Sequence, residues 1–243
     1  MFKKDILFKL AILMLPFLAS CGNNDTVNPT GSNVQLQVLN LSPDVYPVEL
    51  FININRINTA YRFAATPSYF YLPQIDAPLQ VRSTRVNDND SLRIISRDTI
   101  AFQPNTRYSL FITGLYAERS LRTIVTVDDT ASLPPIGKGG KIRFVNASPR
   151  STTNFDIWIN GVPSIMNTAF GEVSNYVTLP PGNYRFRVYP ANTSANSLTE
   201  LPNVTIQDGR LYTLYSQGIV GKVTTDSAAF KLGVLANNPP TPR

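Results

Sequence analysis

Short segments of this chain alternate hydrophobic and polar residues with a period of two, which is the pattern of β-strands that bury one face. In 34–38 the apolar residues alternate with Gln35 and Gln37, and 49–53 and 184–189 follow the same rule. Turn-forming Asn, Asp, Ser, Pro and Gly residues separate these segments. Outside the N-terminal region no helical stripe is found, so the pattern predicts an all-β chain.

The strand pattern occurs twice, because five short segments recur in the same order at an offset of 104 to 107 residues. The matching pairs are 38–43 and 144–149, 49–53 and 156–160, 63–73 and 170–180, 79–82 and 186–189, and 107–110 and 211–214. Several short strands in each half predict two tandem antiparallel β-sandwich modules of immunoglobulin or transthyretin type. We expect them at 34–131 and 141–236, with a Pro- and Gly-containing linker at 132–140 and a tail at 237–243.

The N-terminal twenty residues differ from the rest of the chain. Three lysines precede a run of ten uncharged residues at 10–19, which is the organisation of a secretory signal peptide. A membrane-spanning helix needs roughly 17–25 apolar residues, so this run is too short to be one. We expect 1–20 to be a cleaved signal peptide.

A lipid attachment site follows this run. Leu18, Ala19 and Ser20 precede Cys21, the only cysteine of the chain, and together they resemble the bacterial lipobox. The resemblance implies cleavage before Cys21 and attachment of diacylglycerol to its sulfur, with a further acyl chain such as palmitate on the new amine. Two acyl chains anchor a protein stably in a membrane, with 21–33 as a polar tether. A chance cysteine behind an ordinary secretory signal is the alternative.

Location within a bacterial envelope follows from the residue after Cys21. Gly22 stands where an Asp retains some lipoproteins in the inner membrane, so the outer membrane is the expected location. Whether the modules face the periplasm or the cell surface stays open.

Composition excludes several classes of chemistry. The chain has 43% hydrophobic residues, which argues against disorder, and it has no histidine. Without histidine there is no Ser-His-Asp triad and no imidazole metal ligand. The 22 basic and 16 acidic residues are spread along the chain, so we expect no nucleic-acid binding. We expect no cofactor and no catalytic residues.

Two weaker chemical hypotheses remain open. Asp156 and Glu172 are candidates for the paired carboxylates of a glycoside-acting enzyme, against a structural role in solvent. Asp88 and Asp90 alternate in an oxygen-rich segment and give a weak hint of a calcium site, against a solvated hairpin tip.

An aromatic position marks the candidate binding face. Trp158 lies on the polar side of its strand with Asp156 and Asn160, and Phe51 occupies the equivalent position in the first repeat. Aromatic side chains on a polar sheet face stack on sugars or dock a partner. The alternative is that a loop or the neighbouring module covers them. Other aromatic residues that could extend such a face are Tyr69, Tyr71, Tyr189 and Tyr215.

The second repeat resembles domain-of-unknown-function family 4397. The residues that carry the resemblance are Asn146, Ser148, Pro149, Asp156, Gly161, Phe170, Gly171, Tyr176, Leu179, Pro180, Gly182 and Tyr184. The first repeat departs from this pattern, with Ile54, Ala64 and Ile75 in place of three glycines. The resemblance implies a secreted or lipid-anchored bacterial protein with tandem copies, and it implies no reaction.

These features predict a non-catalytic, membrane-anchored envelope protein. We expect it to act as a binding module for a glycan or another envelope protein. A structural spacer of the envelope is the alternative, and a glycoside-acting enzyme is the third hypothesis.

Overall fold

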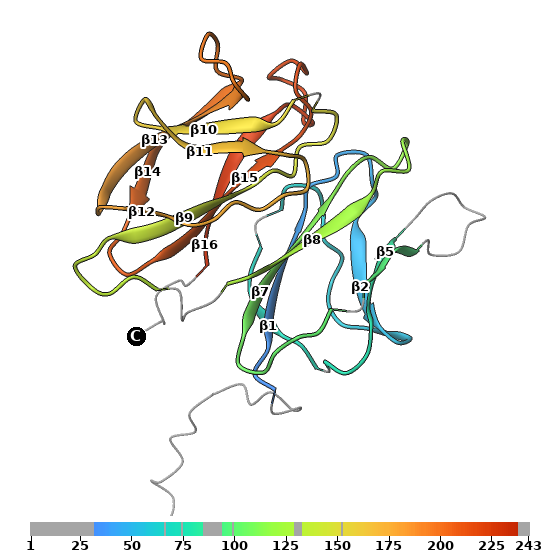
Figure 1. Cartoon of the computed structure of the whole chain (residues 1–243). Coiled ribbons are helices and arrows are strands. Elements are labelled where there is room, and N and C mark those ends of the chain that lie inside the picture. The colour runs from blue at the N-terminus through green and yellow to red at the C-terminus, as the bar shows by residue number, and fades with distance from the viewer. Residues whose placement is uncertain are drawn as a thin grey trace, which may run out of the picture.

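A computed structural model of the chain describes residues 32–65, 67–73, 75–84, 100–128, 133–151 and 153–237, together with the backbone of 94–98. The described part consists of sixteen strands without a helix (Figure 1). The predicted all-β fold is therefore confirmed. None of the described residues forms a helix long and apolar enough to cross a membrane.

The strands fall into two sets of eight. In the first module they are β1 (Gln35–Asn40), β2 (Val48–Ile52), β3 (Asn55–Arg56), β4 (Phe70–Tyr71), β5 (Leu79–Ser83), β6 (Ile94–Asp98), β7 (Arg107–Thr113) and β8 (Arg122–Val127). In the second module they are β9 (Gly140–Val145), β10 (Phe155–Ile159), β11 (Val162–Thr168), β12 (Val177–Leu179), β13 (Gly182–Pro190), β14 (Thr199–Ile206), β15 (Leu211–Gln217) and β16 (Lys231–Ala236).

Each module packs two four-stranded sheets around one core. The first module has the orders β4-β1-β7-β8 and β3-β2-β5-β6, and the second repeats them as β12-β9-β15-β16 and β11-β10-β13-β14. We call the first of each pair the inner sheet and the other the outer sheet. In each inner sheet one pair is parallel, β1 with β7 and β9 with β15. The sandwiches are thus not antiparallel throughout, because the chain between these strands builds the outer sheet and returns to the same end.

The predicted alternation places the core residues in both modules. Leu50 and Ile52 of β2 are buried in the first core, and Phe186 and Val188 of β13 are buried in the second. β-Branched and aromatic side chains fit such a pleated, half-buried surface. These residues therefore determine which face of each strand points inward.

One turn explains why the outer sheets differ. Asn160 and Gly161 both have positive φ, 51° and 84°, which is the geometry of a tight two-residue hairpin turn. This turn supports the seven-residue β11. In the first module Asn53 has φ 55° but Ile54 replaces the glycine, and β3 has two residues. A branched side chain disfavours the second left-handed position, so the hairpin there is short.

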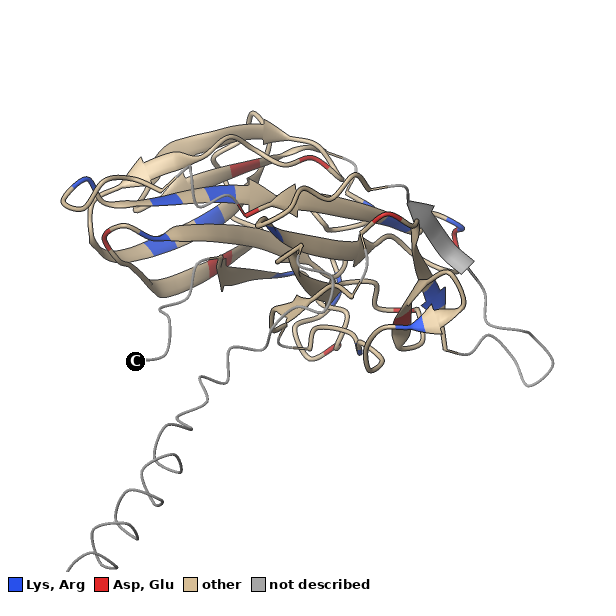
Figure 2. Ribbon diagram, turned by 90° about the horizontal axis from the view of Figure 1, so that it is seen from below, with Lys and Arg blue, Asp and Glu red and all other residues tan. Residues whose placement is uncertain are grey.

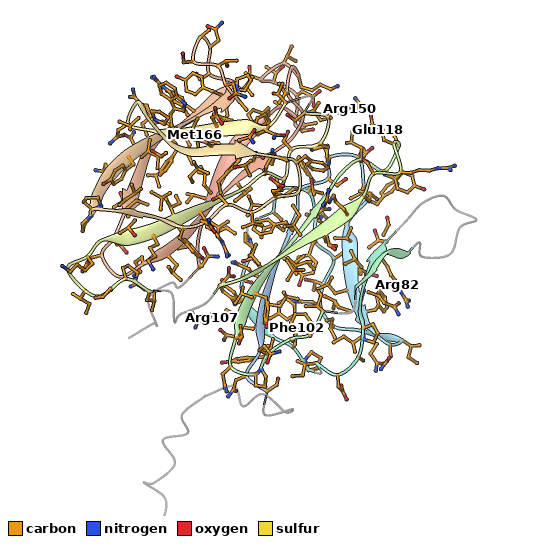
Figure 3. All side chains as sticks on the ribbon, in the orientation of Figure 1. Arg82, Phe102, Arg107, Glu118, Arg150 and Met166 are labelled. Atoms are coloured by element: carbon orange, nitrogen blue, oxygen red, sulfur yellow. The ribbon has the colours of Figure 1, made fainter. Side chains whose placement is uncertain are left out.

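The two modules pack against each other through their inner sheets (Figure 1). A third apolar cluster joins strands β1, β7 and β8 to β9, β15 and β16, and its buried residues are Leu39, Leu41, Phe111, Ile124, Val145, Ala147 and Leu235. Gln37, expected on a solvated face, is 3% exposed because the second module covers it. Figure 3 shows Glu118 and Arg150 close together at one end of this interface, where they form an ion pair.

Equivalent residues of the two modules meet at the interface. The rings of Phe111 and Tyr215, which occupy matching positions of β7 and β15, lie 6.1 Å apart between centroids. Gln37 pairs in register with Ser109, as Arg143 pairs with Thr213. Contact between equivalent faces is the arrangement of a twofold symmetric dimer, here within one chain.

A buried polar network crosses the interface beside the apolar cluster. Asp128, just after β8, accepts a hydrogen bond of 2.5 Å from the Arg143 guanidinium of β9, and both side chains are almost fully buried. Ser109 and Tyr69 donate to the other carboxylate oxygen at 2.5 and 2.7 Å. Arg143 also donates to Thr213 at 3.0 Å. The carboxylate and the guanidinium thus have partners in both modules.

Burial controls protonation in this network. It raises the pKa of Tyr69 well above the ordinary tyrosine value of about 10, so the phenol remains a donor. Burial also raises the pKa of Asp128, while Arg143, Ser109 and Tyr69 act in the opposite direction. Each of these donors therefore helps to stabilise the charged form of the Asp128 carboxylate between the modules.

The described part of the predicted linker is bonded to the second module. The amides of Gly137 and Gly139 donate to the carboxylate of Asp208 at 2.5 and 2.7 Å, and these bonds lower the pKa of Asp208. Gly139 has φ 89°, and a Cβ there would lie 2.1 Å from the carbonyl oxygen of Leu179. Glycine is therefore required where this segment enters β9.

Candidate functional site

The outer sheet of the second module carries an aromatic pair on its solvent side. Trp158 of β10 lies against Tyr189 of β13, with 4.9 Å between ring centroids. Trp158 is half-buried, and the neighbouring Tyr189 is buried. The indole Nε1 is itself buried and has no hydrogen-bond partner among the described residues. The pair lies on the sheet that faces away from the first module.

Asp156 has a structural role in this face. It is 2% exposed, and its two carboxylate oxygens accept hydrogen bonds from the backbone amides of Asn167 at 2.6 Å and Asn192 at 3.0 Å. These bonds tie β11 and the turn after β13 to β10. Asp156 was expected on an open polar face, and the structure corrects this because the two neighbouring segments close over it.

The second carboxylate of the enzyme hypothesis is also occupied with the backbone. Glu172 is exposed, and its Oε2 accepts a hydrogen bond of 2.9 Å from the amide of Ala169 in its own turn. Asp156 and Glu172 each bond to backbone amides of this module, which is what structural carboxylates do.

A hollow of about 390 Å³ lies at the hairpin end of the same sheet. The residues that line it are Asn160, Gly161, Asn183, Tyr184, Arg185, Arg187 and Asn203. Asn160, expected in the binding face, lies in its wall, and its Oδ1 accepts a hydrogen bond of 2.9 Å from the amide of Arg185. The lining is rich in guanidinium and amide groups and contains no carboxylate.

Arg187 links the hollow to the aromatic pair. It pairs in register with Trp158 across the two strands, and its Nε donates to Glu200 of β14 at 3.1 Å. Glu200 and then Tyr189 raise the pKa of Arg187, so the guanidinium stays charged. This side chain is therefore held in place beside the indole.

The equivalent face of the first module is covered. Phe51 is 7% exposed, and the guanidinium of Arg82 lies 4.1 Å above its ring centroid. Arg82 is held by two hydrogen bonds to Oε1 of Gln80. Phe51 was expected on the binding face, and the structure corrects this because Arg82 occupies the position that Tyr189 has in the second module. Figure 3 labels Arg82 on β5.

The motif Asn-x-Ser-Pro stabilises the fold. Asn146 and Ser148 are fully buried. The Asn146 amide donates to the carbonyl of Thr168 at 3.0 Å, and its Oδ1 accepts from Ser216 at 3.0 Å. The first module repeats this arrangement with Asn40, whose amide donates to the carbonyl of Tyr61 at 3.2 Å. The motif therefore joins segments of each module and does not line the hollow.

Several predicted residues lie outside the described part of the chain. These are the lipobox residues Leu18, Ala19 and Ser20, the lipidation site Cys21, and the weak metal candidates Asp88 and Asp90. Within the part that is described, no group of three His, Cys, Asp or Glu side chains is placed to hold a metal ion.

Sequence reasoning missed the two arginines of the hollow, although the signal was present. In 184–189, Phe186 and Val188 face the core, so Arg185, Arg187 and Tyr189 share the other face with Trp158. Of the other tyrosines, Tyr69 and Tyr215 lie at the module interface and do not extend this face. Figure 2 shows charged residues of both signs distributed over both modules.

Comparisons with known proteins identify a family and no activity. No curated protein matches this chain. Among solved structures, the Bacillus anthracis TIE protein matches with 11% identity and a TM-score of 0.23, over 83% of this chain and 43% of its own. The chain thus spans less than half of that protein, and likeness at this level says nothing about function. The family model described as domain of unknown function DUF4397 matches twice, at residues 34–153 and 140–242. This chain therefore belongs to the DUF4397 family, with two tandem copies of its domain.

Proposed function

We propose that this protein is a non-catalytic, lipid-anchored envelope protein that binds a glycan with the outer sheet of its second module. The observation that carries the proposal is the aromatic pair of Trp158 and Tyr189 beside a polar hollow. Sugar rings present apolar C–H faces and hydroxyl edges, so aromatic stacking next to amide and guanidinium donors suits them.

The position of this face supports binding over a purely internal role. Trp158 lies on the outer sheet, whereas the modules meet through their inner sheets. A ligand would therefore reach the indole without separating the modules. The polar network and the apolar cluster between the modules would hold the face in a fixed orientation relative to the first module.

Replacing Trp158 with alanine is expected to weaken glycan binding about tenfold, because an aromatic anchor contributes roughly 1–2 kcal/mol. The free energy of unfolding should fall by only about 1 kcal/mol, through the lost contact with Tyr189. Binding is measured on a glycan array, and stability by urea unfolding followed with circular dichroism.

Phe51→Ala is the matched control at the equivalent position of the first module. Phe51 is buried, so this variant should lose about 3 kcal/mol of stability and keep its affinity where it remains folded. A Trp158→Ala variant that loses as much stability and binds as well as the parent protein would contradict the proposal.

The lipid anchor has its own test. Replacing Cys21 with alanine removes the only thiol of the chain and is expected to release the protein from the membrane fraction, because the acyl chains provide its affinity for lipid. The distribution between the carbonate-washed membrane pellet and the supernatant is measured by immunoblot. Full retention of Cys21→Ala in the pellet would reject the anchor.

The buried junction between the modules favours a second candidate, a structural spacer of the envelope. Spacers need a fixed distance between their ends, and the buried pair of Asp128 and Arg143 provides such a junction. Protease treatment of intact cells distinguishes the two functions, because each is expected in a different compartment. Cleavage places the modules outside, where glycan capture is expected, and protection places them in the periplasm, where a spacer is expected.

A further inference from the structure

We infer that the hollow beside Trp158 binds the acidic group of a saccharide, a carboxylate or a sulfate, with Arg185 as the residue that selects it. This inference rests on the proposed glycan-binding function and names its ligand class.

The two arginines of the hollow differ in their freedom to bind a ligand. Arg187 is held by Glu200 at 3.1 Å, so its charge is largely compensated within the protein. Arg185 lies two residues along β13 on the same face. It is exposed, and its guanidinium has no ion-pair or hydrogen-bond partner among the described residues. It is therefore the guanidinium available for a bidentate contact with an anionic group.

The asparagines make the rest of the hollow rich in donors. Oδ1 of Asn160 already accepts from the amide of Arg185 at 2.9 Å, and Oδ1 of Asn183 accepts from Thr205 at 2.7 Å. Their amide nitrogens are left to donate to a ligand. With no carboxylate in the lining, the hollow offers donors and positive charge and lacks a charged acceptor. A ligand that brings acceptors and negative charge fits this arrangement.

The size and position of the hollow fit a sugar unit next to the aromatic pair. Its volume of about 390 Å³ falls within the usual range for small-molecule sites, roughly 300–1,000 Å³. Arg187, in its wall, is the cross-strand partner of Trp158. One unit of a saccharide would therefore place its acidic group on Arg185 while a neighbouring unit contacts the indole.

The first module lacks this site, although it has the same strands. Gln80 of β5 takes the place of Arg187, and Pro78 precedes β5 where Arg185 stands in β13. Ile54 replaces Gly161 in the hairpin turn. The two arginines and the glycine of the hairpin turn are thus found only in the second module. We therefore expect each chain to bind one acidic group.

The test uses the full-length protein in detergent micelles and pairs of polysaccharides with the same backbone, of which one member carries acidic groups and the other is uncharged or less charged. The pairs are polygalacturonate and its methyl ester, chondroitin sulfate and unsulfated chondroitin, and carboxymethyl dextran and dextran. We expect at least one acidic member to bind about tenfold tighter than its neutral partner, and Arg185→Gln to remove that advantage. Arg62→Gln, which removes an exposed arginine of the first module, should leave it unchanged.

The outcomes separate the two proposals. Equal binding of both members of a pair, weakened by Trp158→Ala, overturns the acidic-group inference and leaves glycan binding standing. An equal loss in Arg185→Gln and Arg62→Gln also overturns the inference, because the attraction would then be a general effect of charge. Lack of binding to every polysaccharide, charged or neutral, overturns both proposals.

Discussion

Replacing Arg143 with glutamine is expected to lower the free energy of unfolding by about 3–5 kcal/mol, because it leaves Asp128 as a buried carboxylate without its cation. The pair is 2.5 Å long and almost fully buried between the modules. Urea unfolding of the purified protein measures the loss. Trp158 is the only tryptophan, so its fluorescence reports on the second module while circular dichroism reports on both. In the parent protein the two signals should change together, and in Arg143→Gln they should separate.

The double variant Asp128→Asn with Arg143→Gln is the control for this prediction. Asn and Gln are the residues that the other module carries at the equivalent positions, Asn237 and Gln37. Both charges are removed together, so the loss should be smaller than in either single variant. If the loss of stability in the double variant equals the sum of the losses in the two single variants, the ion pair does not couple the modules.

The pH dependence of stability is a second measurement that tests the prediction for Arg143→Gln. Burial raises the pKa of Asp128, and removal of the Arg143 charge raises it further. A carboxyl group whose pKa is raised in the folded state lowers the free energy of unfolding when the group is charged. Protonation of the group restores that free energy. The difference in stability between Arg143→Gln and the parent protein should therefore shrink as pH falls toward 4, near the ordinary value for Asp of about 3.9.

Replacing Asp156 with alanine should lower the free energy of unfolding by about 2–4 kcal/mol. Its carboxylate accepts two backbone amides, from Asn167 and Asn192, and hydrogen bonds to a charged group contribute roughly 1.5–3 kcal/mol each. Both amides would lose the acceptor that the buried Asp156 carboxylate provides. Thermal and urea unfolding check this result, with the fluorescence of Trp158 as the probe of the second module.

Glu49→Ala is the matched comparison in the first module, where Glu49 occupies the position of Asp156. Glu49 pairs with Arg56 at 2.7 Å, and the Arg56 side chain is 58% exposed, so solvent screens this pair and its loss should be below about 1 kcal/mol. A stable Asp156→Ala protein would contradict the structural role, and would return the carboxylate to the group of candidate catalytic residues.

The sequence was sufficient to predict the strands, because alternation depends on local side chains. Leu50 and Ile52 face the core as their spacing predicts. Gln37 was placed wrongly, since alternation within one strand cannot show that a second module covers the polar face. The adjacent apolar residues Val38 and Leu39 were the available signal, because a strand with both faces buried loses its alternation.

The candidate site was predicted only in part, because it depends on contacts between strands. Trp158 was found from its position on a polar face, and it does lie there. The state of Phe51 depends on Arg82 of a different strand, and the state of Asp156 on the amides of two turns. Neither contact has a local sequence signal. The hollow was missed because Arg185 and Arg187 matter only once β13 is placed beside β10.

Contact between equivalent faces has a consequence for how such a chain can evolve. A single domain that pairs with itself must carry a surface complementary to its own copy. Once two copies are fused, the contact forms within one chain at an effective concentration of about millimolar, and each side is released from self-complementarity. Asp128 and Arg143 are an example of such a change. In a dimer of two first modules Asp128 would face Gln37, and in a dimer of two second modules Arg143 would face Asn237. The ion pair would therefore be absent from either self-paired dimer, and it forms only between a first and a second module.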